Sequence, residues 1–128
     1  MDTALRAPHV GIDVESVQRR GARAWRVTWR VTSSLPLTVI EAWHPHRRFR
    51  SSRLRRSLRV MAGRSASLEM PARVDFAPGV VVENCFLVLR ATSGRRPWRI
   101  LARFTLRVRT DGTPDPRVEK VDVHPAEG

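Results

Sequence analysis

An alternation of apolar and mostly polar side chains over residues 98–109 constrains this chain more than any other feature. The apolar positions recur with a period of two and are filled by Trp98, Ile100, Ala102, Phe104, Leu106 and Val108. Most of the positions between them are arginine. A period of two over such a length is typical of a strand that buries one face. The segment therefore predicts a β fold whose outer surface carries a row of guanidinium groups.

Weaker versions of the same pattern recur along the chain, separated by turn residues. They predict strands or extended segments at 10–15, 25–32, 35–43, 68–76, 80–91 and 118–123. Residues 85–89 are apolar at every position, which is typical of a central strand covered on both faces. About seven or eight short strands of this kind predict an all-β antiparallel sandwich. We expect one domain over residues 1–128, with loose ends at about 1–7 and 125–128.

Three of these segments resemble the immunoglobulin-like β-sandwich superfold, namely residues 25–31, 80–91 and 98–109. The chain has one cysteine and no tyrosine, so it lacks the disulfide and the tyrosine corner of antibody domains. The resemblance implies an architecture without a specific family. It implies no activity, because one superfold carries many functions.

Residues 47–59 fit the strand pattern less well and contain seven arginines. A helix over 52–62 would place Leu54, Leu58 and Met61 on one face. The same helix would carry arginines in its first turn, where the helix macrodipole disfavours cations. We therefore favour an extended segment that leads into a strand, while strand, loop and short helix all stay open for 52–62.

The charge of the chain points to an acidic partner. The net charge is +12, and arginine accounts for all but one of the 24 basic residues. Such a balance favours nucleic acid, an anionic membrane surface or an acidic protein, although a GC-rich coding sequence also produces an arginine excess. Phe49 is the single aromatic within residues 47–59, so phosphate contacts are better represented there than base stacking. A nucleic-acid site would use Arg47, Arg48, Arg50, Arg53, Arg55, Arg56 and Arg59.

The hypothesis that we favour is a protein interface. It follows from the hairpin that the predicted strands 80–91 and 98–109 would form. Pairing Thr92 with Trp98 across a loop at 93–97 sets Phe86 opposite Phe104 on the inner face. The outer face then combines an apolar strip with arginines, as protein interfaces do. We expect a non-catalytic binding or scaffold module with a protein partner or a second copy of itself. Its interface would comprise Leu87, Leu89, Leu101, Arg99, Arg103 and Arg107.

Evidence for catalysis is weak. His44, His46 and Glu41 are close in sequence, but the adjacent arginines disfavour a bound cation. Cys85 lies in an apolar run, where a thiol is expected to be buried with a raised pKa. No nucleophile elbow or glycine-rich phosphate loop is present. We expect no enzyme activity, no cofactor and no metal, and a cytoplasmic location because no apolar leader is visible.

Overall fold

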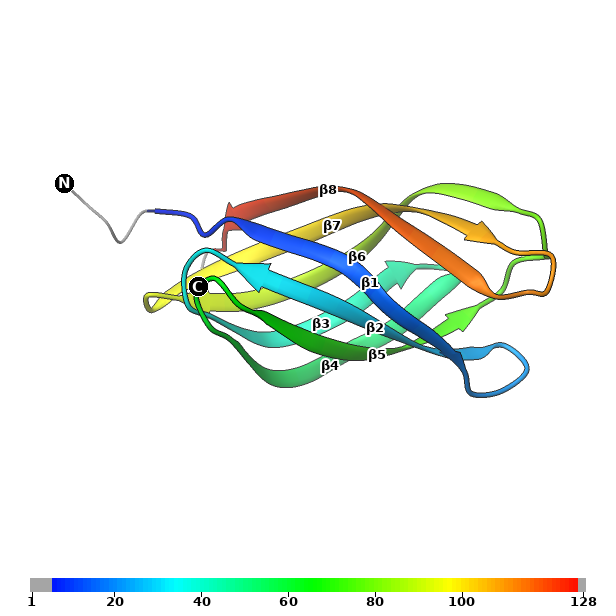
Figure 1. Ribbon diagram of the computed structural model, residues 1–128, viewed down its shortest axis with the longest axis horizontal. Helices are drawn as coiled ribbons and strands as arrows, with labels where there is room; N and C mark the ends of the chain where they lie inside the picture. The colour runs from blue at the N-terminus through cyan, green and yellow to red at the C-terminus, as the bar shows by residue number, and fades with distance from the viewer. Residues whose placement is uncertain (1–5, 127–128) are drawn as a thin grey trace.

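The computed structural model describes residues 6–126, which form eight strands joined into one antiparallel sheet (Figure 1). The strands are β1 (Val10–Arg19), β2 (Ala24–Ser33), β3 (Leu37–His46), β4 (Phe49–Val60), β5 (Ser65–Val74), β6 (Val81–Ser93), β7 (Arg96–Val108) and β8 (Pro114–Pro125). Their order across the sheet is β1-β2-β5-β4-β3-β6-β7-β8. The two edge strands, β1 and β8, also contact each other, so the sheet curls until it is nearly a barrel.

The all-β prediction is confirmed, and the helix considered for 52–62 is wrong. These residues lie within or directly after β4, where Leu54 pairs with Ala42 and Leu58 pairs with Val39 of β3. Both leucines pack against the core from this strand. An extended strand also spreads its arginines along the surface instead of crowding them at a helix N-terminus.

The predicted loose ends fall partly on residues 1–5 and 127–128, which are outside the described residues. Inside that range the last strand continues to Pro125. Pro125 pairs with Trp98, and the Ala126 N–H donates to the Pro97 carbonyl over 3.0 Å. Pro8 is buried at the other end.

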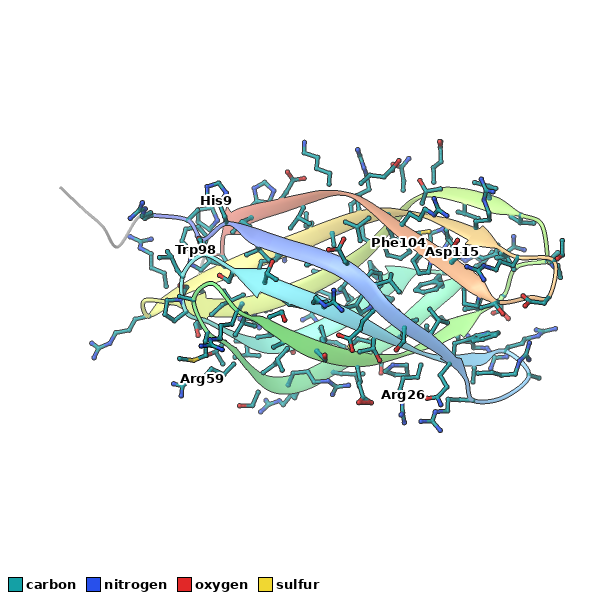
Figure 2. The ribbon with its side chains drawn as sticks, viewed as in Figure 1. His9, Arg26, Arg59, Trp98, Phe104 and Asp115 are labelled. Atoms are coloured by element: carbon teal, nitrogen blue, oxygen red, sulfur yellow. The ribbon has the colours of Figure 1, made fainter. Side chains whose placement is uncertain are left out.

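The core confirms the alternation that opened the sequence argument. The six alternating apolar residues of β7 are all at most 3% exposed. Trp29, Phe49 and Phe104 meet at its centre, with ring centroids of Phe104 5.3 Å from Trp29 and 5.4 Å from Phe49. Figure 2 shows Phe104 among the strands, whereas Arg26 lies along the lower edge of the molecule. Burial of large aromatic rings of this kind dominates the stabilisation of a small β domain.

The predicted register between β6 and β7 is wrong by one residue. A two-residue turn at Gly94 and Arg95 lets Ser93 pair with Arg96, and both turn residues have positive φ, as in a type I′ hairpin. Ala91 rather than Thr92 is therefore opposite Trp98. A slip of one residue exchanges the two faces of a strand, with direct consequences for the proposed interface.

The sheet opens between β4 and β5, which lie along the lower side of Figure 1. These two strands pair only through Phe49 with Val74 and Arg50 with Arg73. Two residues before Arg73, β5 contains Pro71. Its nitrogen carries no hydrogen, so it cannot donate a hydrogen bond to an adjacent strand. We call this opening the seam. It runs between residues 51–60 of β4 and 65–72 of β5.

Candidate functional site

The outward side of β3, β6 and β7, here called the outer face, carries an apolar row. Trp43 pairs with Val88 and Val88 pairs with Leu101, so one side chain from each strand stands in line across the sheet. Trp43 and Leu101 are half-buried, and Val88 is 7% exposed. Phe86, also half-buried, follows two residues before Val88 and is paired with Arg103. Apolar and aromatic side chains are thus clustered where solvent reaches the sheet.

Arginines surround this row and shape a shallow depression of about 570 Å³. The Arg53 guanidinium lies 4.1 Å from the centre of the Trp43 ring, a cation–π contact. Arg90 binds the Glu41 carboxylate over 2.9 Å. Arg99 has no carboxylate within 4 Å among residues 6–126, so positive charge remains at the rim. The depression is lined by Arg53, Arg90, Arg99, Leu101, His124, Pro125 and Ala126.

The residues predicted for the interface lie on both sides of the sheet in the structure. Leu87 and Leu89 are fully buried and face the core, because the true register puts Leu87 opposite Ala102 and Leu89 opposite Ile100. Arg107 does face outward, but it is six residues from Leu101 along β7, about 20 Å at about 3.3 Å per residue. It pairs with Asp115, at the opposite end of the molecule from Trp98 in Figure 2.

The remaining predicted interface residues stay on the outer face. Leu101 and Arg99 line the depression together. Arg103 is half-buried beside Phe86, and its Nε is buried without a hydrogen-bond partner in the described part of the chain. The apolar partners of these residues are therefore Trp43, Phe86 and Val88 rather than the two leucines of β6.

The arginines of the predicted nucleic-acid site extend from the β3–β4 turn along β4. None of the seven has a carboxylate within 4 Å among the residues that the structure describes. They do not share one surface, because Arg53 covers Trp43 on the outer face whereas Arg47, Arg50 and Arg56 line the seam. Phe49, the aromatic expected between them, is fully buried and offers no stacking surface.

Part of the seam, beside residues 69–72 of β5, forms a groove of about 1130 Å³. Six arginines line this groove, and the single carboxylate in its lining is that of Glu69. Glu69 lies 3.4 Å from Arg26, and Arg73 lies 3.8 Å from Asp75. The other four arginines have no carboxylate within 4 Å in the described chain, and they are Arg20, Arg47, Arg50 and Arg56.

His44 lies beneath the seam and is 1% exposed. The Trp29 indole N–H donates to its Nε2 over 3.2 Å, so the neutral ring carries its proton on Nδ1, 3.2 Å from the Ser51 hydroxyl. Burial lowers the pKa of His44 to about 3, against a smaller opposing effect of the Pro71 backbone. The imidazole is therefore a neutral structural group.

The other candidates for chemistry do not assemble a site. The His46 Nδ1 accepts the Arg48 backbone N–H over 3.0 Å, and its ring lies against Phe76. Burial raises the pKa of the Cys85 thiol to about 11, as expected for a thiol within the core. Residues 6–126 contain no cluster of three His, Cys, Asp or Glu side chains that could hold a metal ion.

Comparison with known proteins adds no relative from which a role could be transferred. No protein-family model, no curated protein and no solved structure matches this chain. The described residues also contain no helix long and apolar enough to cross a membrane.

Sequence reasoning missed Trp43, Phe86 and Val88 of the outer face, and it missed the seam. Trp43 gave no usable signal, because an irregularity in register between Val39 and Glu41 reverses the alternation that buried Leu37 and Val39 begin. The buried face of β6 was equally ambiguous, since apolar side chains fill both of its faces.

Proposed function

We propose that this protein is a non-catalytic, cytoplasmic binding module that engages a protein partner through the outer face. The observation that carries this proposal is the row of Trp43, Val88 and Leu101, which crosses three strands and is bordered by arginines. Tryptophan and arginine are enriched where protein interfaces derive most of their affinity, and phenylalanine is enriched at interfaces in general. A single buried cysteine fits a reducing compartment.

The charge of the outer face indicates which partner fits. Arg53, Arg90 and Arg99 border Leu101, and Glu41 is already bound to Arg90. A second copy of this chain would set arginine against arginine, which costs affinity. A partner surface with an apolar centre and carboxylates around it would complement both features. The proposed occupant is therefore an acidic protein other than this chain.

The test begins with p-benzoylphenylalanine in place of Leu101, to cross-link the partner in the native cells, and continues with the purified partner. Leu101→Glu should weaken its binding by about tenfold or more, equivalent to about 1.4 kcal/mol. Val81→Glu is the matched control, because Val81 is 53% exposed and lies outside the depression. Equal affinity of Leu101→Glu and wild type, with both folded by circular dichroism, would overturn the proposal.

A second function, nucleic-acid binding, is favoured by the seven arginines of residues 47–59, which have no carboxylate partner among residues 6–126. Phosphate contacts would make such binding weaken steeply between about 50 and 200 mM salt. Fluorescence anisotropy with labelled single- and double-stranded oligonucleotides tests this. Changing Arg53, Arg55 and Arg56 together to alanine should abolish the binding. Absence of binding at low salt would end this alternative.

We further propose that the nearly closed sheet is an immunoglobulin-like sandwich. Its layers would be β1-β2-β5 and β4-β3-β6-β7-β8. The two residue pairs between β4 and β5 support this division, because they are the sole ladder joining the two groups in the described chain. A crystal structure in which β4 and β5 pair along their whole length would contradict it.

A further inference from the structure

The seam leaves one edge of β5 without a neighbouring strand. Residues 65–72 pair with β2 on one side, but the pairing with β4 begins only at Arg73. Main-chain groups of successive residues point to opposite edges of a strand. The Asp75 N–H donates toward β4, to the Arg48 carbonyl, whereas the Val74 N–H donates to the Arg23 carbonyl before β2. The odd-numbered residues of β5 therefore direct their main-chain groups into the seam.

A side chain takes one of the positions that a strand would otherwise fill. The Arg56 guanidinium reaches across from β4 and donates to the Glu69 carbonyl over 3.2 Å. This contact satisfies a carbonyl that the amide of an adjacent strand would satisfy in a complete sheet. The Arg56 contact is exposed, so an incoming chain can displace it.

The charge around this edge selects the chemistry of the incoming chain. Four arginines of the seam, Arg20, Arg47, Arg50 and Arg56, have no carboxylate within 4 Å in the described chain. Arg50 also faces Arg73 directly across the two strands, a like-charge pair that an added carboxylate would relieve. An extended peptide bearing Asp or Glu would meet guanidinium groups with its side chains and open amides with its backbone.

We propose that the seam is a second protein-binding site, which takes an extended acidic peptide as an added strand along β5. This inference goes beyond the outer-face proposal, because it concerns different strands and a different mode of binding. The guanidinium of Arg56 would move from the Glu69 carbonyl to a peptide carboxylate, and a peptide N–H would take its place. Residues 65–72 would accommodate about seven added residues at about 3.4 Å each.

Three labelled probes test the proposal on the full-length protein by fluorescence anisotropy. The first is the peptide Asp-Val-Glu-Thr-Asp-Val-Glu, capped at both ends. The second has the same sequence and charge but carries N-methyl groups on alternate residues, which removes the hydrogen bonds of one strand edge. The third is a short oligothymidylate. The proposal expects the first peptide to bind about tenfold or more tightly than the methylated peptide.

Three protein variants separate the seam from the outer face. Arg50→Glu should weaken the first peptide by about tenfold or more, since it removes a cation and pairs with Arg73. Arg95→Glu makes the same charge change in the distant β6–β7 turn and should leave binding within about twofold, once the general electrostatic effect is screened by salt. Leu101→Glu, which tests the outer face, should also leave peptide binding unchanged.

Amide hydrogen exchange distinguishes strand addition from charge attraction alone, because only strand addition would slow the exchange of main-chain amides of β5. The first peptide should slow exchange at the Ser67 and Glu69 amides, which face the seam. Equal affinity for the methylated and unmethylated peptides would overturn the proposal, as would binding of the oligothymidylate alone or of no probe. Loss of peptide binding in Leu101→Glu with retention in Arg50→Glu would move the peptide site to the outer face and overturn the seam assignment while supporting the first proposal.

Discussion

The buried imidazole of His44 should make the stability of this protein fall as the pH is lowered through 6.5. Its pKa is about 3 in the folded chain, against 6.5 as the ordinary value. Because the folded pKa is lowered, the unfolded chain binds more protons, and stability rises with pH in the window between the two values. Protonating the ring would also set a second donor against the Trp29 N–H that now donates to Nε2.

The size of the effect follows from the two pKa values. At pH 5 the unfolded histidine is almost fully protonated and the folded one is neutral, which costs about 2 kcal/mol of stability relative to pH 7.5. Lowering the pH further to 3 would raise the loss to about 4 kcal/mol, close to the full difference between the two pKa values. Urea denaturation at pH 7.5 and pH 5 should therefore show the midpoint falling by about 1 M at pH 5.

Two variants isolate the contribution of His44 from that of the other groups. His44→Gln cannot titrate but can still accept the Trp29 N–H, so its stability should change little between pH 7.5 and pH 5. His124→Gln removes an exposed histidine and should keep the pH dependence of the wild type. Parallel losses in the wild type and His44→Gln would refute the reasoning. A His44 ring resonance that titrates between pH 5 and 7 in NMR spectra would refute it independently.

Three further predictions concern packing, reactivity and charge. Phe104→Ala should lower the free energy of unfolding by about 3–5 kcal/mol in urea titrations, and Phe104→Leu by about 1.5 kcal/mol or less; similar small losses for both would contradict the central role of the ring. Cys85 should resist a disulfide reagent such as DTNB at pH 8 until the protein is unfolded, whereas rapid labelling of the native protein would show an accessible thiolate. Arg50→Glu should stabilise the fold by up to about 1 kcal/mol through a cross-strand pair with Arg73, and a destabilised variant would contradict the observed pairing.

The strands that alternate cleanly could be predicted from the sequence because one face of each is buried. In β7 and in the central part of β2, every predicted core position is at most 6% exposed, including Trp25, Trp29, Trp98 and Phe104. With a period of two, the apolar positions of such a strand identify the face that is buried. Segments with polar residues on both faces, such as β4, gave no such information, and their secondary structure stayed open.

The register of the β6–β7 hairpin could not be deduced from apolar patterning. Residues 85–89 are apolar throughout, so either set of alternate positions could have faced the core. The choice then depended on the turn, and Arg95 adopts a φ of 67° that arginine seldom takes. The predicted loop at 93–97 was therefore too long. The error moved Leu87 and Leu89 to the wrong face and with them the apolar half of the proposed interface.

The distribution of ion pairs bears on whether the arginine excess has a local function. A GC-rich coding sequence raises arginine everywhere and would scatter unpaired arginines along the chain. In the described structure all eight ion pairs involve cations outside residues 47–59. The seven arginines of residues 47–59 remain without a carboxylate, as do others such as Arg20, Arg99 and Arg107, but residues 47–59 hold the densest group of them in the described chain. Because β4 borders both the outer face and the seam, this concentration of charge reaches both proposed sites. Composition bias explains the number of arginines and the unpaired ones scattered along the chain, but it does not explain why the densest group lies on the strand that borders both candidate binding surfaces.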